Sequence, residues 1–371
     1  MKKIVLTGGG TAGHVTPNIA LLPALQAAGY EIAYVGSYEG IEKKLIADFN
    51  IPYTGISTGK FRRYLDPKNF SDPFRVMKGF VEARNYLKNY QPDVVFSKGG
   101  FVSVPVVRAA ASLHIPCIIH ESDMTPGLAN KLCIPVAEKV CCNFPETMKN
   151  IPADKAVLTG SPIRAELAQG SRLAGLNMCG FTANKPVIMV IGGSLGAANV
   201  NKAVRDALPK LLEDFQVVHL CGKDKIDNLL LNTPGYKQFE YIKAELKDIF
   251  AMADVVISRA GANAICELLA LKKPNILIPL PAASSRGDQL LNAASFEAQG
   301  YSIVLNEDDI TTNLLVDKVH ELYFNRQNYV EAMSRSHQMD AINTIMLLIN
   351  EAANKSHTQS VSYTHLRAHE T

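Results

Sequence analysis

The sequence predicts an α/β protein built from two Rossmann-like, doubly wound domains. Short, continuous apolar runs alternate with helical patterns, which is typical of strands buried on both faces of a parallel sheet. A glycine-rich loop follows an apolar run twice, at residues 8–13 and 192–196. The segment Asp93–Gly100 (DVVFSKGG) recurs as Asp254–Gly261 (DVVISRAG). The repeat indicates two similar halves, with a ligand site at the carboxyl ends of the strands, in a cleft between them.

The apolar runs place the expected elements along the chain. We predict strands at residues 4–7, 31–35, 93–96, 116–120, 186–191, 216–220, 254–257 and 275–278. A helix after the second glycine loop is predicted by four apolar residues at helical spacing, Val200, Val204, Leu208 and Leu211.

Glycine and proline near residues 159–162 mark the expected domain boundary. We therefore expect one domain over residues 1–161 and a second over 162–337, with a helix over 338–355 that returns to the first domain. The stretch 360–371 has no apolar period and reads as an appended, non-native tail. It is left out of the functional argument.

Composition narrows the functional class. Hydrophobic residues make up 47% of the 371 residues and charged residues 20%, as in ordinary globular proteins. The formal net charge of +3 is too small to argue for nucleic-acid binding. The N-terminus lacks the apolar core of a signal peptide, and no apolar stretch approaches the roughly 18 residues of a membrane span. The seven scattered cysteines form no CxxC pair, so we expect free thiols in a reducing cytoplasm and no metal site.

The first glycine loop, GGGTAGH at residues 8–14, lies between a predicted strand and a predicted helix. Such loops bring backbone amides close to an anion, most often a phosphate. The spacing of Gly8, Gly10 and Gly13 also matches the dinucleotide fingerprint, but NAD binding needs an acidic residue at the end of the second strand. That strand ends in Val35–Gly36–Ser37, which argues against an NAD enzyme. His14 adds a group that ordinarily titrates near neutral pH.

Polar residues follow several other strands. The run His120–Asp123 is either a solvated strand end or a set of ligands for sugar hydroxyls, with Glu121 or His14 as general base. Glu267 is either a surface glutamate or an acceptor for both hydroxyls of a ribose. Arg286 fits a surface cation. Gln289 and Asn292 equally fit residues that bind the hydroxyls of a sugar.

Cations and large apolar residues mix over residues 60–88, where Asp72–Pro73 can cap a helix. One interpretation is a helix that packs on the core and has solvated charges. The other is a surface that binds an anionic membrane. The membrane-facing residues would then be Phe74 and Met77, with the cations Arg75 and Lys78.

Six ordered motifs together resemble one family closely. They are GGGTAGH (8–14), SKGGFVS (97–103), HESD (120–123), GSPIR (160–164), GGSLG (192–196) and RGDQ (286–289). The chain resembles the MurG family of N-acetylglucosaminyltransferases from Met1 to about residue 350. The resemblance implies a glycosyltransferase B fold and inverting transfer of N-acetylglucosamine (GlcNAc) from UDP-GlcNAc to the 4-hydroxyl of MurNAc in undecaprenyl-diphospho-MurNAc-pentapeptide, the lipid I acceptor. It also implies no metal requirement, peripheral attachment to the cytoplasmic face of the membrane, and other cell-wall enzymes as candidate partners.

The resemblance also assigns residues. His14 and Glu121 are the candidate bases, and the sequence does not choose between them. The donor-binding set is Thr11, Ala12, Gly13, Asp123, Arg164, Ser194, Ile242, Ala262, Asn263, Ala264, Ile265, Cys266, Glu267 and Gln289. Two of these depart from the family pattern: Ala12 replaces a common glycine, which requires a negative φ there, and Asp123 stands where many members have asparagine.

Two other functional classes remain open from the sequence. A UDP-GlcNAc 2-epimerase would share the fold and the donor site but would need no lipid acceptor. A non-catalytic scaffold would bind a nucleotide sugar or a membrane without turnover.

Overall fold

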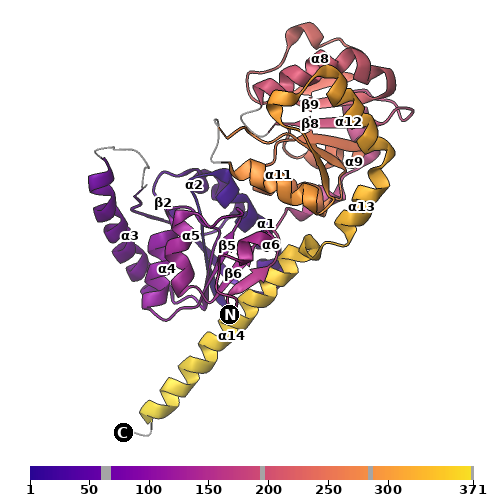
Figure 1. Cartoon of the computed structure of the whole chain (residues 1–371). Helices are drawn as coiled ribbons and strands as arrows, with labels where there is room; N and C mark the ends of the chain where they lie inside the picture. Colours follow the sequence, from indigo (N-terminus) through magenta and orange to yellow (C-terminus); the bar gives the residue numbers. More distant parts are fainter. Residues whose placement is uncertain (60–67, 193–196, 283–286, 369–371) are drawn as a thin grey trace. The chain divides into compact units, whose positions relative to one another are not determined.

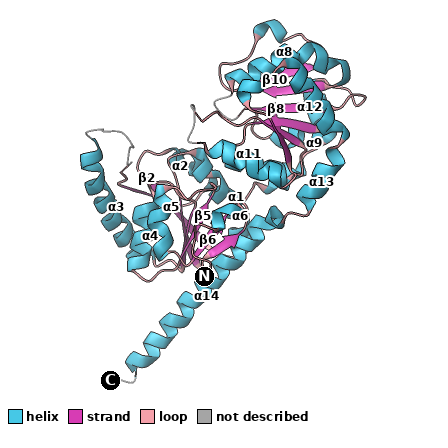
Figure 2. Cartoon of the chain, in the orientation of Figure 1, coloured by secondary structure: helices cyan, strands magenta, loops and turns pink. Residues whose placement is uncertain are grey.

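The computed structural model describes residues 1–59, 68–192, 197–282 and 287–368. The chain divides into two compact units (Figure 1). Unit 1 comprises Met1–Arg164 together with Asp340–Thr371, and unit 2 comprises Ala165–Met339. Figure 2 distinguishes the strands of each unit from the helices that cover them.

Unit 1 contains a seven-stranded sheet in the order β3-β2-β1-β4-β5-β6-β7, and all its strand pairs are parallel. Chain order reverses between β1 and β4, which is where ligands bind in doubly wound sheets. Its strands are β1 (Lys3–Thr7), β2 (Glu31–Ser37), β3 (Tyr53–Ile56), β4 (Val94–Ser97), β5 (Cys117–Glu121), β6 (Lys139–Cys142) and β7 (Ala156–Leu158).

Helices cover both faces of this sheet. Its helices are η1 (Ala12–His14), α1 (Thr16–Ala27), α2 (Ile41–Ile46), η2 (Ala47–Phe49), α3 (Lys68–Tyr90), α4 (Ser103–Ser112), α5 (Leu128–Cys133), η3 (Ile134–Val136), α6 (Pro145–Met148) and α14 (Ala341–Ala368). The short helix η7 (His337–Asp340) spans the boundary between the two units. One buried cluster joins Val5 and Val95 to α3, α4 and α5. A second joins Ile4 and Leu6 to α1 and α14. Successive β1 residues thus enter opposite cores, which explains why this strand is apolar throughout.

The C-terminal helix α14 packs in unit 1, far in sequence from its neighbours. Ile345 and Ile349 are fully buried in the same cluster as the apolar residues of α1. Asn350 Oδ1 accepts a hydrogen bond of 2.8 Å from the Tyr30 hydroxyl. The helix backbone extends to Ala368, past the predicted end at residue 355. Each residue that extends a helix adds a backbone hydrogen bond, so a helix can continue past the end of its apolar face.

Unit 2 contains a six-stranded sheet in the order β10-β9-β8-β11-β12-β13, and its pairs are again all parallel. Its strands are β8 (Val187–Ile191), β9 (Gln216–Leu220), β10 (Tyr236–Phe239), β11 (Val255–Ser258), β12 (Asn275–Leu277) and β13 (Ser302–Val304). Its helices are η4 (Ala165–Gln169), α7 (Arg172–Cys179), α8 (Ala198–Asp214), η5 (Asn228–Leu230), α9 (Leu246–Met252), α10 (Ala262–Ala270), α11 (Asp288–Ala298), η6 (Glu307–Asp309), α12 (Thr312–Phe324) and α13 (Arg326–Ser334). The predicted stripe on α8 is buried against this sheet.

The sequence repeat marks the central strand pair of each sheet. In unit 1 the Asp93 carboxylate accepts the Lys3 N–H at 2.6 Å, and the Asp93 N–H donates to Lys3 O at 2.9 Å. In unit 2 the Asp254 carboxylate accepts the Val187 N–H at 2.8 Å, and the Asp254 N–H donates to Val187 O at 2.9 Å. Each aspartate therefore joins the starts of two neighbouring central strands, β1 and β4 in unit 1 and β8 and β11 in unit 2.

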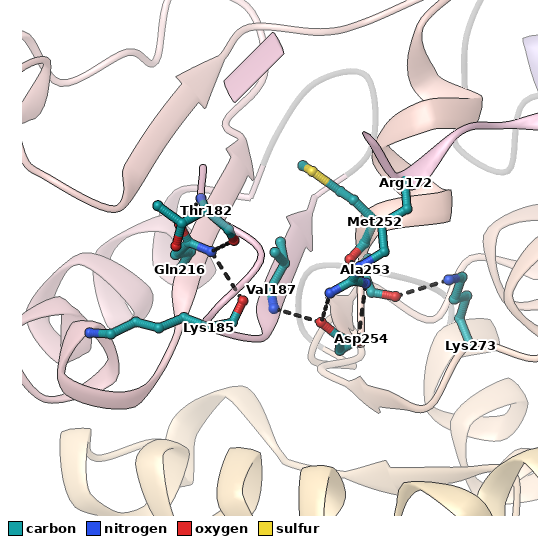
Figure 3. A network of polar contacts seen from close by, with 9 residues as sticks. All are labelled: Arg172, Thr182, Lys185, Val187, Gln216, Met252, Ala253, Asp254 and Lys273. Carbon is teal, nitrogen blue, oxygen red and sulfur yellow. Dashed lines mark hydrogen bonds and ion pairs between the residues drawn. The ribbon is translucent and has the colours of Figure 1, made fainter. Parts of the chain in front are cut away.

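In unit 2 Asp254 belongs to a wider polar network (Figure 3). Both guanidinium NH groups of Arg172 donate to the Asp254 carboxylate, at 3.2 and 3.1 Å, and one also donates to Met252 O at 2.7 Å. Lys273 Nζ donates to Ala253 O at 2.9 Å. Burial lowers the pKa of Lys273 to about 8, with a smaller opposite effect from Asp254.

The structure confirms the predicted fold class, two Rossmann-like parallel sheets with helices. Each of the eight predicted runs corresponds to a strand, with bounds that differ by a residue or two. Five further strands, β3, β6, β7, β10 and β13, lie at outer positions of the sheets and have only three or four residues each. Two of them, β3 (YTGI) and β10 (YKQF), contain polar residues or glycine between their apolar residues and so form no continuous apolar run.

From the contacts of Asp254 we predict a specific loss of stability. Asp254→Ala should lower the free energy of unfolding by about 1–3 kcal/mol, because the Val187 N–H and the Arg172 guanidinium lose their acceptor. Asp206→Ala is the control, since Asp206 forms only an exposed i,i+4 ion pair with Lys202, and it should change stability by less than about 0.5 kcal/mol. Denaturant unfolding of the full chain measures the free energy of unfolding of both variants. Equal losses in the two variants would contradict the stabilising role of Asp254.

Candidate functional site

The first glycine loop is folded around other parts of unit 1. The Gly9 N–H donates to Gly99 O at 3.3 Å, and the Gly10 N–H donates to Glu42 Oε2 at 3.1 Å. Gly100 must be glycine, because a Cβ there would lie 2.2 Å from Gly9 O. Two amides expected to bind a phosphate are therefore already satisfied by the protein. This local arrangement does not support the initial interpretation of residues 8–10 as a phosphate cradle.

His14 closes this loop at the end of η1 and is half-buried. Its Nδ1 lies 3.0 Å from the Thr11 hydroxyl, which fixes the orientation of the ring. Burial lowers the pKa of His14 to about 4, and the nearby Lys98 cation acts in the same direction, whereas the Gly9 carbonyl and Glu42 oppose it. The imidazole is therefore neutral at physiological pH and able to accept a proton.

Beside the loop, Lys98 forms a buried polar chain with the end of β5. Its Nζ donates to His120 Nδ1 at 2.8 Å and also contacts the Ser122 hydroxyl. His120 Nε2 in turn lies 2.9 Å from Gly160 O. Burial, reinforced by Lys98, holds the pKa of His120 well below its usual range, so this ring is neutral, with the proton on Nε2. Fully buried, His120 orients Lys98 and the 160 loop and is not positioned to meet a substrate.

The carboxylate of Glu121 is engaged by its own loop. One oxygen accepts the Asp123 N–H at 2.9 Å, and the other accepts the Gly127 N–H at 3.0 Å and the Asn130 side-chain amide at 2.8 Å. The residue is 3% exposed. This geometry makes Glu121 the organiser of residues 122–127.

The remaining residues assigned in unit 1 are half-buried or exposed. Thr11 and Ala12 are exposed, while Gly13 and Asp123 are half-buried. Ala12 begins η1 and is not among the residues with positive φ, so its methyl group fits without backbone strain. The Asp123 carbonyl accepts the Thr147 hydroxyl at 3.0 Å. Arg164, the last residue of the first segment of unit 1, is half-buried.

In unit 2 the run 262–267 forms the first two turns of α10, which follows β11. Ile265 and Cys266 are buried in the core, so only their backbone can face a ligand. The other four side chains of the run, including Glu267, are half-buried. The first-turn amides of α10 thus offer donors for an anion, and a carboxylate follows one turn later.

A second helix start lies nearby along the sheet. Gln289, in the first turn of α11, accepts the Leu280 N–H on Oε1 at 3.1 Å. Asn292 Nδ2 donates to Ala260 O at 3.1 Å and so joins α11 to the connection between β11 and α10. Ile242, after β10, is half-buried. Ser194 with its loop (193–196) and Arg286 lie outside the described residues.

The mixed basic and apolar segment is partly described, since residues 60–67 lie outside the described ranges. On α3, Phe74 is 79% and Met77 65% exposed, and Arg75 and Lys78 are exposed beside them. Phe80 packs instead against the core, so α3 has one buried and one exposed apolar face. Among the described residues, no helix is long and apolar enough to cross a membrane.

Sequence reasoning missed three buried residues of unit 1: Glu42, Lys98 and Asn130. Asn130 donates a hydrogen bond to Glu121, and the charges of Lys98 and Glu42 act on His14. Only Lys98 carried a signal, because it occupies the repeat position of Arg259, which is also buried and contacts the carbonyls of Ile278 and Pro279. Within the described ranges, no group of three or more His, Cys, Asp and Glu residues is arranged to hold a metal ion.

Comparison with known proteins identifies the family. Residues 4–142 match the glycosyltransferase family 28 N-terminal domain, and residues 187–347 match its C-terminal domain. Two UDP-N-acetylglucosamine–N-acetylmuramyl-(pentapeptide) pyrophosphoryl-undecaprenol N-acetylglucosamine transferases, from Lachnospira eligens and Lachnoclostridium phytofermentans, are each 64% identical over 351 residues, 95% of this chain and 99% of theirs.

Solved structures give the same picture. The crystal structure of Acinetobacter baumannii MurG is 29% identical, with a TM-score of 0.75 over 95% of this chain and 100% of its own. A UDP-GlcNAc 2-epimerase from Neisseria meningitidis has a TM-score of 0.67 over 95% of this chain and 100% of its own, at 14% identity, a likeness of fold alone. The chain therefore belongs to glycosyltransferase family 28, in the group of N-acetylglucosamine transferases that includes MurG.

Proposed function

We propose that this protein transfers GlcNAc from UDP-GlcNAc to the 4-hydroxyl of MurNAc in undecaprenyl-diphospho-MurNAc-pentapeptide, with inversion at the anomeric carbon. The main support for the proposal is the 64% identity, over nearly the full length of both chains, to relatives named as N-acetylglucosamine transferases for N-acetylmuramyl-(pentapeptide) pyrophosphoryl-undecaprenol. The product would be the disaccharide-bearing lipid of cell-wall synthesis.

The donor is assigned to unit 2. The amide donors at the start of α10 suit a diphosphate, and Glu267 suits the two ribose hydroxyls. Gln289, Ile242 and Ser194 add further proposed contacts in unit 2. The proposed donor residues of unit 1 are Thr11, Ala12, Gly13, Asp123 and Arg164. Helix N-termini offset the negative charge that grows on the diphosphate as it leaves. The proposal includes no metal requirement, in keeping with the resemblance.

The acceptor and the base are assigned to unit 1. The 4-hydroxyl oxygen attacks the anomeric carbon, the bond from that carbon to the UDP oxygen breaks, and UDP leaves with the bonding electrons. A base takes the hydroxyl proton. His14 is favoured over Glu121, because its ring is neutral and half-buried in a loop, whereas both Glu121 oxygens already accept hydrogen bonds.

The exposed face of α3 is assigned to the membrane. Phe74 and Met77 would enter the interface while Arg75 and Lys78 meet anionic headgroups. Such attachment would bring unit 1 to a lipid-linked acceptor at the cytoplasmic face, as a peripheral protein.

The transfer reaction is tested by incubation of labelled UDP-GlcNAc with a lipid I analogue and identification of the product. We expect UDP release that depends on the acceptor, a β-linked disaccharide product, and the same rate in the presence of EDTA. Release of UDP without acceptor, together with a 2-epimer, would favour the epimerase. Binding of UDP-GlcNAc without turnover would favour a scaffold.

The choice of base is tested by His14→Ala and Glu121→Ala at saturating donor and acceptor. His14→Ala should reduce kcat by about 10²–10⁴-fold, the usual contribution of a general base. Glu121→Ala should reduce thermal stability and have a smaller effect on kcat, because it frees three loop donors. Near-normal turnover in both variants would mean that neither residue is the base.

The pH dependence supplies a second test of His14. The pKa of His14 is lowered in the folded protein, so the ring protonates, and activity falls, only as the pH drops toward about 4 rather than through the ordinary histidine value of 6.5. The acid limb of kcat/KM and an NMR titration of the His14 ring should agree. A ring that titrates near 6.5 would contradict the burial of His14.

The membrane role predicts a separation of two activities. Serine at both Phe74 and Met77 should weaken binding to anionic vesicles and leave turnover of a soluble, short-chain acceptor unchanged. Phe324→Ser is the matched control, since Phe324 is 75% exposed on unit 2 and should affect neither activity. Equal loss of vesicle binding and soluble turnover in the double variant would indicate a folding role for this face.

A further inference from the structure

Glu42 is a buried charge that the proposed reaction does not use. It lies on α2, the short helix after β2, and its side chain is 0% exposed. Burial of a carboxylate is costly unless donors satisfy it. Here three donors do so: the Gly10 N–H at 3.1 Å, the Ser37 N–H at 2.9 Å and the Ser37 hydroxyl at 2.5 Å.

Glycines from separate segments make room for this carboxylate. A Cβ on Gly9 would lie 2.5 Å from Glu42 Cδ, and one on Gly36 would lie 2.8 Å from Glu42 Cγ. A Cβ on Gly40 would lie 2.1 Å from Glu42 Oε1. The first glycine loop, the end of β2 and the start of α2 are therefore shaped around an anion that belongs to the chain itself.

The same carboxylate acts on His14. Gly10, whose N–H it accepts, precedes η1, the turn that ends in the His14 ring. Among the described residues, the charged groups that act on this ring are Lys98, from the end of β4, and Glu42, from α2. Their effects oppose each other, because a nearby cation disfavours the imidazolium and a nearby carboxylate favours it.

We propose that Glu42 is a positioning residue for the transfer reaction: its carboxylate ties the loop that carries His14 to the end of β2 and so fixes the imidazole where it meets the acceptor hydroxyl. The inference rests on the proposed transfer function and on His14 as the proton acceptor. Glu42 touches no substrate and acts through Gly10 and Ser37. A displacement of a catalytic group by about 1 Å can cost 10²-fold in rate, so a tether of this kind has a measurable effect.

Glu42→Gln in the full chain tests the tether. Glutamine has nearly the same shape, but its NH2 group faces a backbone N–H that needs an acceptor. We expect kcat to fall about 10–100-fold and KM for UDP-GlcNAc to change less than kcat, because most proposed donor residues lie in unit 2 and only Thr11, Ala12 and Gly13 share the loop. The pKa of His14, followed by NMR, should fall further because a negative charge is lost. Glu39→Gln, which removes an exposed charge from the same connection, should leave kcat and the His14 titration unchanged.

Gly9→Ala disturbs the same contact without a change of charge. Its φ is not positive, so alanine fits the backbone, but the added methyl meets the Glu42 carboxylate. We expect a comparable loss of kcat, and a double variant with Glu42→Gln that loses less than the product of the two single effects, because both changes break one contact. This variant also decides the question if circular dichroism shows that Glu42→Gln does not fold.

Wild-type kcat with an unchanged His14 titration in Glu42→Gln would overturn the inference, as would independent, multiplicative losses in the double variant. Failure of the proposed function is recognised separately, in the wild-type protein, as absence of UDP release that depends on the acceptor. In that case the positioning role for transfer fails with it.

Discussion

An aspartate at the start of the fourth strand of unit 1, and its counterpart in unit 2, fix the central register of both sheets. Asp93 exchanges hydrogen bonds with Lys3, and Asp254 exchanges them with Val187. Because side chains alternate along a strand, a slip of one residue would turn every later side chain to the opposite face. The register that begins at Asp93 pairs Ser97 with Thr7 at the far end, which brings Lys98 beside the loop of His14. The geometry of the candidate site thus depends on a contact at the opposite edge of the sheet.

The two units place different polar contacts on this shared frame. The repeat places a buried cation after the central strand in both, and each cation reaches the end of the next strand. Lys98 contacts His120 and Ser122, whereas Arg259 contacts two carbonyls and pairs with Glu307. In unit 1 the cation therefore helps to keep His14 neutral, which suits a proton acceptor. In unit 2 the carboxylate of Glu307 offsets the cation, and the proposed ligand contacts come from helix starts.

The sequence predicted the fold well because its strongest signals are local. Apolar runs identify the inner strands, which are buried on both faces. The stripe from Val200 to Leu211 identifies α8, because a helix that buries one face has apolar residues at a fixed period. The outer strands β3 and β10 were not predicted, because threonine, glycine, lysine and glutamine interrupt their apolar residues. The ordered motifs indicate the family, and the comparisons confirm it. The sequence does not choose between His14 and Glu121 as the base, because hydrogen-bond partners such as Gly127 and Asn130 become visible only in the folded loop.

The glycine loop shows why a motif alone does not specify its ligand. Glycines that let a backbone approach a phosphate equally let it approach a carboxylate, because both present oxygens to the same amide donors. In unit 1 the anion is Glu42, which is distant in sequence from Gly10 and reaches it only because β1 and β2 are neighbours. The carboxylate of Glu42 joins the loop to the end of β2 in the protein without substrate. A proton acceptor at the end of such a loop is held in place by the fold itself, and this preorganisation is what a transfer reaction requires of its base.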